Sequence, residues 1–230
     1  MGFTNIILNL LEKMIHENRD KINFYMCDCI EFMKSKPDKC YDLAIVDPPY
    51  GIGVNHNMGR RKGQKSSGYK KAYWDNEPPP IEYFEELFRV SKNQIIWGAN
   101  HFIQSISASG NNTNTPCWLM WNKGFSEEVT FAQFELAWTS FKSTCKKYDK
   151  SPNQLDRTHP TQKPIDLYRK TLVLFATKGM KILDTHGGSM TIARACDMEG
   201  FALDICEIDE EYFNNGLKAF DNYKRQLTLF

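Results

Sequence analysis

The sequence predicts an α/β fold, with a mixed, mostly parallel sheet, helices on both faces and an antiparallel hairpin at one edge. One observation is the apolar run 43–46, which has the length and composition of a buried strand and ends at Asp47. Another is residues 181–207, which follow the order strand, glycine-rich turn, helix, strand and acid of a mononucleotide-binding βαβ unit. Between them, apolar runs alternate with segments of helical periodicity, as in α/β proteins.

Length and composition fit an ordinary globular protein. A chain of 230 residues is long enough for one α/β domain with a substantial core. With 41% hydrophobic and 25% charged residues and a net charge of +1, nothing global demands a polyanionic partner. A nucleic-acid site must therefore arise from local clusters of basic residues.

The sequence favours a cytoplasmic location. No run reaches the roughly 18 apolar residues of a membrane span, and the start lacks a signal-peptide pattern. Its seven cysteines are scattered, and Cys27 and Cys29, the closest pair, have no matching pair of metal ligands. We therefore expect reduced thiols and no metal site.

The first half of the chain alternates helical and strand patterns. Residues 4–18 place apolar side chains at helical spacing behind a Thr4 cap, which predicts an amphipathic helix. The elements expected next are a strand at 22–26, a helix at 30–34, the strand at 43–46, a helix over 83–90, a strand at 94–97 and a helix at 102–106.

The second half contains the predicted edge hairpin and the βαβ unit. A strand at 117–121 precedes two segments, 131–138 and 141–144, which we expect to form an antiparallel hairpin at the sheet edge. The elements expected after them are a helix through 167–175, a strand at 181–184, a helix at 190–199, a strand at 201–206 and a helix at 209–223.

The tetrad Asp47-Pro48-Pro49-Tyr50 ends the first buried strand. Its prolines fix φ and lack N–H groups, so the turn is stiff and its carbonyls point outward. A carboxylate and a prolyl carbonyl in such a turn can accept both hydrogens of an exocyclic amine, while Tyr50 offers a flat face to a base. The alternative is an ordinary turn in which Asp47 only caps the strand.

The unit at 181–207 predicts a nucleoside site. Its glycines let the backbone approach a ligand, and Glu207, at the end of the second strand, can accept both ribose hydroxyls. The separation of Asp184 and Glu207 is close to the roughly 20 residues expected. Because Gly187-Gly188-Ser189 fits no phosphate-binding pattern, a nucleoside without phosphates is the better ligand.

Basic residues gather in two segments without periodicity. Residues 51–76 predict a long mobile loop, and 142–158 a polar connection. Tyr69, Tyr73 and Trp74 accompany the basic groups of the loop, a composition that suits phosphate contacts and base stacking. A solvated loop without function is the alternative. The basic residues expected to contact DNA are Arg60, Arg61, Lys62, Lys65, Lys70, Lys71, Lys146 and Lys147.

Together these motifs resemble the permuted, β-group DNA amino-methyltransferases, which use S-adenosylmethionine to modify adenine N6 or cytosine N4. The resemblance extends from about Ile22 to Tyr223 and implies a Rossmann-like methyltransferase fold. The motifs that carry it are Asp28, Asp47-Pro48-Pro49-Tyr50, His159-Pro160-Thr161-Gln162-Lys163-Pro164, Asp184-Thr185-His186-Gly187-Gly188-Ser189 and Glu207.

The resemblance implies a division of labour within the site. Asp28 would contact the adenine of the cofactor and Glu207 its ribose. Lys163 would lie near the carboxylate of the cofactor's methionine part. The cofactor residues it implies are Asp28, Asp47, His159, Lys163, Asp184, Thr185, His186, Gly188, Ser189 and Glu207. Three positions depart from the family, which usually has Pro-Phe at Thr185-His186 and Gly at Met190.

Asp at the first position of the tetrad resembles the adenine enzymes, whereas Ser is more usual for cytosine N4. The implied catalytic residues are Asp47, Pro48, Pro49 and Tyr50, acting on a base that is flipped from the duplex and stacked on Tyr50. The remaining alternatives are a cytosine-N4 DNA enzyme, an RNA adenine methyltransferase and a non-catalytic nucleic-acid-binding module.

The domain prediction is one methyltransferase domain over 1–223, followed by a tail at 224–230. Family members usually carry a target-recognition insert, for which only about 142–158 is available, so target specificity is expected to be short or relaxed. The tail resembles the peptide with which bacterial proteins dock on the replicative sliding clamp. Its expected contact residues are Gln226, Leu227, Leu229 and Phe230; packing on the domain itself is the alternative.

Overall fold

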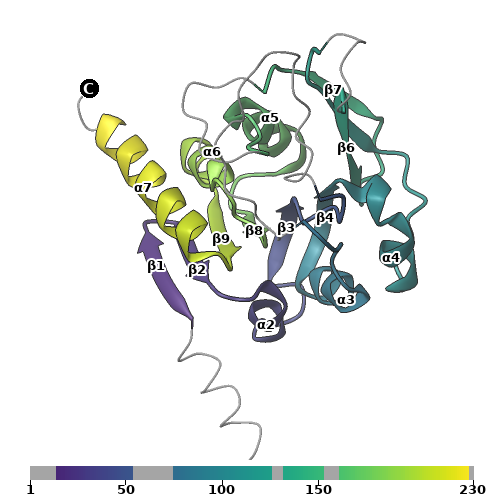
Figure 1. The fold of residues 1–230 in the computed structure, drawn as a ribbon, viewed down its shortest axis with the longest axis horizontal. Coiled ribbons are helices and arrows are strands. Elements are labelled where there is room, and N and C mark those ends of the chain that lie inside the picture. The colour runs from purple at the N-terminus through teal and green to yellow at the C-terminus, as the bar shows by residue number, and fades with distance from the viewer. Residues whose placement is uncertain (1–13, 54–74, 126–131, 153–160, 228–230) are drawn as a thin grey trace, which may run out of the picture.

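The computed structural model describes residues 14–53, 75–125, 132–152 and 161–227 (Figure 1). Its strands are β1 (Ile15–Arg19), β2 (Ile22–Met26), β3 (Tyr41–Val46), β4 (Ser91–Trp97), β5 (Trp118–Asn122), β6 (Phe134–Thr139), β7 (Lys146–Asp149), β8 (Lys181–Asp184) and β9 (Ala202–Glu207). Its helices are α2 (Cys29–Lys34), α3 (Ile81–Val90), α4 (Ile103–Ala108), α5 (Ile165–Phe175), α6 (Thr191–Glu199) and α7 (Glu210–Leu227), with a 3₁₀ turn, η1 (Ala99–His101).

The described strands form a nine-stranded sheet in the order β1-β2-β9-β8-β3-β4-β6-β5-β7. From β2 to β4 every neighbouring pair is parallel, and antiparallel pairs join β1 to β2 and β6 to both β4 and β5. This confirms the predicted Rossmann-like architecture of a mixed, mostly parallel sheet. Because β8 and β3 are adjacent, the late βαβ unit lies beside the early tetrad.

Helices cover both faces of the sheet (Figure 1). In β3, Leu43 and Ile45 pack in the cluster that contains α5, α6 and α7, whereas Ala44 and Val46 pack in the cluster of α2, α3 and α4. All four side chains are buried, which explains why this strand is a continuous apolar run rather than an alternating one.

The predicted N-terminal helix is wrong over 15–18, and its residues 4–13 lie outside the described part. Ile15–Arg19 is strand β1, which pairs antiparallel with β2 after a tight turn in which Asp20 has φ +57°. Pairing with the sheet edge overrides the helical spacing. Ile15 is accordingly exposed rather than part of a buried helix face.

The predicted hairpin partner at 141–144 is also wrong. The strand is instead β7, in the segment expected to be irregular, and it runs parallel to β5. Both edges of β6 are occupied, by β4 and β5, so the chain must cross to the free edge of β5. The antiparallel edge hairpin of this sheet is β1–β2, at the opposite side.

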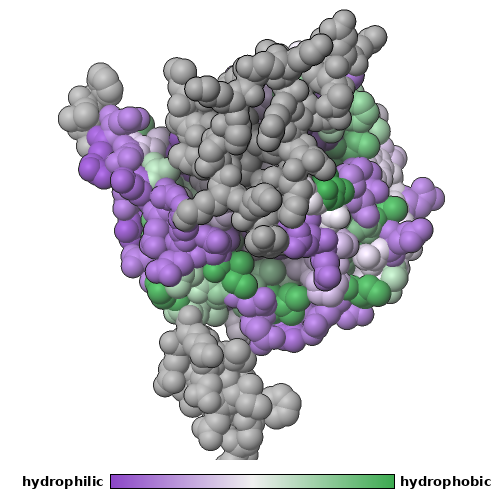
Figure 2. Space-filling model, in the orientation of Figure 1, coloured by the Kyte–Doolittle hydropathy of each residue, from purple (hydrophilic) through white to green (hydrophobic). Residues whose placement is uncertain are grey.

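The last helix is longer than expected. α7 continues to Leu227 instead of ending at Tyr223, so Gln226 and Leu227 lie in its final turn and not in an extended tail. Residues 228–230 lie outside the described part, and with them Leu229 and Phe230. Figure 2 shows the mainly hydrophilic surface along α7. Among the described helices, none has the length and hydropathy needed to span a bilayer.

Candidate active site

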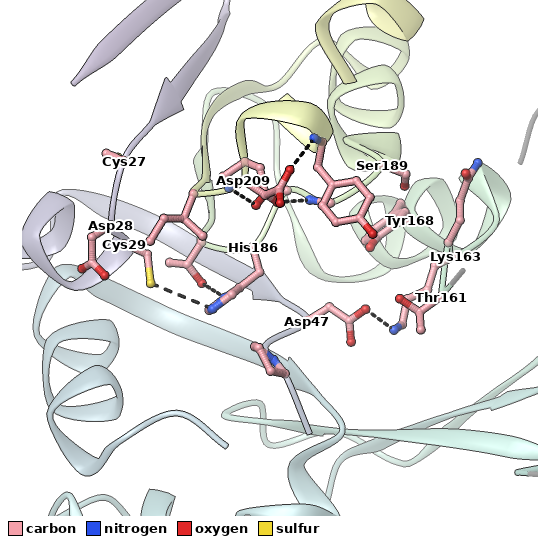
Figure 3. Close-up of a pocket in the computed structure, with 18 residues that line it drawn as sticks. Cys27, Asp28, Cys29, Asp47, Thr161, Lys163, Tyr168, His186, Ser189 and Asp209 are labelled. Atoms are coloured by element: carbon pink, nitrogen blue, oxygen red, sulfur yellow. Dashed lines mark hydrogen bonds and ion pairs between the residues drawn. The ribbon is translucent and has the colours of Figure 1, made fainter. Parts of the chain in front are cut away.

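The carboxyl ends of β2, β3, β8 and β9 surround a pocket of about 320 Å³ (Figure 3). Open α/β sheets bind ligands at this edge, beside the point where the strand order reverses. The predicted residues that line the pocket are Asp28, Asp47, Pro49, Lys163, Thr185, His186, Gly188, Ser189 and Glu207. It therefore brings together residues from both ends of the chain.

Asp47 follows β3 and forms an ion pair with Lys163 (Figure 3). The Lys163 Nζ atom lies 2.5 Å from Asp47 Oδ2, and the Tyr50 hydroxyl donates to Asp47 Oδ1 at 2.8 Å. Lys163 Nζ also lies 3.0 Å from Glu135 Oε2, although its side chain is only 1% exposed. The ammonium group is thus directed at two carboxylates of the protein.

Burial raises the pKa of Asp47, and the neighbouring Glu135 raises it further, while Lys163 opposes both effects. Glu135 has two lysines beside it, Lys163 and Lys123, and together they lower its pKa to about 2 despite burial. The two carboxylates thus share one cation but differ in proton affinity, and Asp47 is the more basic.

Asp75 stabilises the turn that follows Asp47. One oxygen of the buried Asp75 carboxylate accepts the backbone N–H groups of Tyr50 and Gly51, at 2.6 and 3.0 Å, and its carbonyl accepts from Gly53. The prolines and this cap together fix the backbone around the carboxylate. No sequence motif marks Asp75, which lies 25 residues beyond Tyr50 along the chain.

Tyr50 is held against the protein rather than in the pocket wall. Its ring stacks on His101, with centroids 5.1 Å apart and planes 16° apart. Gly98 has φ +70°, and a Cβ there would lie 2.0 Å from the Tyr50 ring, so this contact requires glycine. Neither Tyr50 nor Pro48 is among the described residues that line the pocket.

Glu207 and Asp28, two of the acids that line the pocket, cap backbone N–H groups. Glu207 Oε2 accepts from Gly188 at 2.7 Å, and Oε1 accepts from Asp209 at 2.9 Å. Asp28 Oδ1 caps α2 by accepting from the backbone N–H groups of Ile30 and Glu31. A carboxylate accepts about four hydrogen bonds, so both acids keep acceptor capacity toward the pocket.

Asp184 ends β8 and is buried, with Oδ1 accepting the backbone N–H of His186 at 3.0 Å. Burial raises the pKa of Asp184 to about 7 and lowers that of His186 to about 4. Burial also raises the pKa of Glu207. The pocket therefore penalises charge until a ligand supplies a partner.

We predict that Asp184→Asn stabilises the ligand-free protein at pH 8. Since the pKa of Asp184 is about 7 in the folded state and about 3.9 when unfolded, the folded state binds more protons between these values and stability falls as pH rises through them. The amide stays neutral and still accepts from His186, so it avoids this loss. Urea unfolding of the variant and the wild type at pH 5 and pH 8 tests this prediction. If the stability difference between the two proteins is no larger at pH 8 than at pH 5, the prediction is contradicted.

The departure at Thr185-His186 forms a hydrogen-bonded chain. The Thr185 hydroxyl lies 2.7 Å from the Tyr83 hydroxyl and 2.9 Å from His186 Nδ1, and His186 Nε2 lies 3.9 Å from the Cys29 sulfur. Figure 3 shows His186 and Cys29 facing each other beside the pocket. Polar partners thus replace the apolar side chains usual at these positions.

The departure at Met190 is accommodated by a glycine on another helix. Met190 precedes α6 in the left-handed region, at φ +52°, where a non-glycine residue costs about 1–2 kcal/mol. Gly216, within α7, allows this: a Cβ there would lie 2.5 Å from the Met190 sulfur and 3.0 Å from its Cβ.

Gly216→Ala is predicted to destabilise the protein by about 1–3 kcal/mol, because overpacking outweighs the helix propensity gained. In a Met190→Gly background the same change should stabilise instead, since the contacting sulfur and Cβ are both gone. Chemical denaturation of the four proteins measures both effects. The same sign of effect in both backgrounds would refute this pairing.

The described pocket lining does not include the predicted residues Asp184, Lys146 and Lys147. Lys146 and Lys147 lie on the outer strand β7, where Lys146 donates to Thr144 and Lys147 pairs with Asp149. The remaining predicted residues, His159, Arg60, Arg61, Lys62, Lys65, Lys70 and Lys71, lie outside the described part.

Several site residues were missed by sequence reasoning. Tyr168, Ile208 and Tyr212 line the pocket without belonging to a motif. Glu135 in β6 and Lys123 after β5 form an ion pair of 2.6 Å behind Lys163. A charged residue within a predicted strand was the available signal for Glu135, because such residues are rarely buried unless paired.

The sequence is similar to those of known DNA methylases. A family model for N6/N4 DNA methylases matches residues 104–218. The type II methyltransferase M2.MboI of Moraxella bovis is 26% identical over 78% of this chain and 80% of its own. The methylase YubD of Escherichia coli K12 is 24% identical, over 89% of this chain and 92% of its own.

Two solved structures share the fold. The complex of M1.HpyAVI with SAM superposes with a TM-score of 0.59 at 19% identity, covering 86% of this chain and 98% of that one. The cytosine-N4-specific PvuII DNA methyltransferase has the same TM-score at 12% identity, covering 85% of each chain. These similarities establish the shared architecture.

Proposed function

The chain belongs to the DNA methylase family of N6/N4 amino-methyltransferases, and from this premise we propose that it methylates adenine N6 in DNA, using S-adenosylmethionine. One observation carries the proposal: Asp47, directly after β3, lines the same pocket as Asp28, which follows β2, and Glu207, which ends β9. A base amine at Asp47 would therefore lie beside a cofactor bound between Asp28 and Glu207.

The pocket suits this cofactor chemically. Carboxylates at three strand ends match the amines and hydroxyls of a nucleoside joined to an amino acid. A Cβ at Gly187 would lie 3.2 Å from the Cys206 carbonyl, so glycine permits the tight passage of the turn. We assign Asp28 to the adenine, Glu207 to the ribose hydroxyls, and Asp184 to the methionine amino group. When bound, the cofactor supplies an electrophilic methyl group.

The Asp47 carboxylate and the Pro48 carbonyl would each accept a hydrogen bond from one N–H group of the target amine. This orients the nitrogen lone pair toward the methyl group and increases its nucleophilicity, so catalysis is mainly positioning and electrostatics. Lys163 and Tyr50 each contact one Asp47 oxygen, so the amine would take the place of one of them on the carboxylate. Stacking of the flipped base on Tyr50 requires a ring face that His101 does not cover.

The choice of adenine rests on Asp47 in the tetrad. The structural likeness to a cytosine-N4 enzyme means that the fold alone does not distinguish the two bases. The test is incubation of the protein with methyl-labelled cofactor and unmethylated DNA, followed by digestion to nucleosides. We expect label in N6-methyladenine; label in N4-methylcytosine, or no label in the DNA, would refute the proposal.

For DNA contacts we propose the basic residues of 51–76 together with Lys146 and Lys147, and for target reading the segment 142–158. With no larger insert, we propose a short or relaxed recognition sequence. A methylation-site map that shows one long, strict target would overturn this.

For the C-terminus we propose docking on a bacterial sliding clamp, through Gln226, Leu227, Leu229 and Phe230. The position of Gln226 and Leu227 in the last turn of α7 requires that turn to unwind on binding. Equal clamp affinity of the full chain and of a chain lacking 226–230 would end the idea.

A further inference from the structure

Lys163 lies in a buried cluster with more than one acceptor. Its Nζ atom is within 3.0 Å of both Asp47 and Glu135, and its side chain is 1% exposed. It also lies over the rings of Trp97 and Tyr50, with distances of 5.2 and 5.9 Å to their centroids. Enclosed in this way, the ammonium group depends on protein carboxylates instead of water.

Both groups that occupy Asp47 share a second acceptor, Glu135 Oε2. Lys163 Nζ lies 3.0 Å from that atom, and the Tyr50 hydroxyl lies 3.4 Å from it. Glu135 is itself held from the other side by Lys123, at 2.6 Å from Oε1. An incoming amine can therefore take the place of Lys163 or Tyr50 on Asp47 while each keeps a partner.

We propose that Glu135 is a positioning residue for methyl transfer: it holds whichever of Lys163 and Tyr50 the target amine replaces on Asp47. This rests on the proposed function of the pocket and assigns a role to a residue outside the motifs. Glu135 contacts neither base nor cofactor in this scheme. It acts through Lys163.

The charges around Asp47 give the proposal a signed pH readout. The charged and titratable groups that interact electrostatically with the carboxylate are Lys163 from the segment before α5, Glu135 from β6, Tyr50 from the turn, Asp184 from β8 and Tyr168 from α5. Of these, Glu135 raises the pKa of Asp47 and Lys163 lowers it. Replacing Glu135 by glutamine removes its repulsion of Asp47, while Lys163 still pairs with Asp47. The pKa of Asp47 should therefore fall, and the acidic limb of the rate profile should move to lower pH.

The test compares Glu135→Gln with Glu86→Gln in the full-length protein. Glu86 is a matched control, because it is ion-paired to Arg89 and its side chain is 17% exposed, against 16% for Glu135, but it lies in α3 outside the pocket. Single-turnover transfer to unmethylated DNA is measured from pH 5 to 9, with cofactor affinity and unfolding midpoint. For Glu135→Gln we expect a rate about tenfold lower at pH 8, cofactor affinity within about twofold of the wild type, and the acidic limb displaced to lower pH.

Equal transfer rates in the two variants would overturn the proposal. So would a lower rate in Glu135→Gln without displacement of the acidic limb of its pH–rate profile. If Glu135→Gln does not fold, Glu135→Asp decides: it keeps the charge but shortens the reach, so kcat should fall severalfold at unchanged KM, and an unchanged kcat overturns the idea. A wild type that transfers no methyl group overturns the proposed function and this inference together, whereas an active wild type with indifferent variants overturns this inference alone.

Discussion

An Asp47→Ala variant is expected to bind S-adenosylmethionine within about threefold of the wild type but to transfer methyl groups about 10²–10³ times more slowly, as when one preorganised group is lost from an active site. The amine then has no carboxylate to orient it. The fold should survive, because Lys163 retains Glu135 as its partner.

The measurement is single-turnover transfer beside cofactor titration. Asp42→Ala is the control: Asp42 lies in the same strand and forms an ion pair with Lys92, but it is outside the pocket. Asp47→Asn should be intermediate, since its amide oxygen still accepts one hydrogen bond. Transfer by Asp47→Ala at the rate of the control would contradict the role of the tetrad.

Lys163→Met is expected to lower the free energy of unfolding by about 3–5 kcal/mol at pH 8, the usual cost of removing one partner from a buried ion pair. Of the described ion-pair partners of Asp47 and Glu135, Lys123 alone then remains to balance two negative charges. Asp47 loses the cation that lowers its pKa, so the folded state retains a proton that the unfolded state releases. Stability should accordingly fall as pH rises above about 4.

Urea unfolding of Lys163→Met at pH 5 and pH 8 tests this, and the defect should be larger at pH 8. Adding Glu135→Gln should recover part of the loss, because one of the two carboxylates becomes neutral. A Lys163→Met protein as stable as the wild type at pH 8, or a defect independent of pH, would show that the cluster is not electrostatically coupled as the contacts indicate.

The parts of the site that depend on local sequence were predictable. The strand that ends at Asp47 is apolar on both faces because helices cover both faces, and the glycine turn before α6 is encoded within a few residues. Their placement in one pocket followed from the rule that ligands bind at the carboxyl edge of such sheets. Family resemblance then connected Lys163 to the same site.

The parts that depend on distant partners were not predictable. Strand β1 forms because the edge of β2 is available, and β7 lies beyond β5 because β6 has no free edge. The sequence placed Lys163 at the pocket but not its ion pair with Glu135, which joins two segments that no motif connects. The Met190 and Gly216 contact likewise appears only when α7 packs beside the turn.

In our proposal, one pocket has a base half at Asp47 and a cofactor half at Glu207. Comparing Asp47→Ala with Glu207→Gln is the sharpest test of this division. For each variant, the cofactor dissociation constant and the single-turnover rate at saturating cofactor are measured. We expect opposite results from the two variants. Asp47→Ala should retain affinity and lose rate, whereas Glu207→Gln should lose about tenfold in affinity, as a charge-assisted hydrogen bond weakens, and keep its rate within a few fold. Equal losses of affinity and rate in both variants would contradict the division.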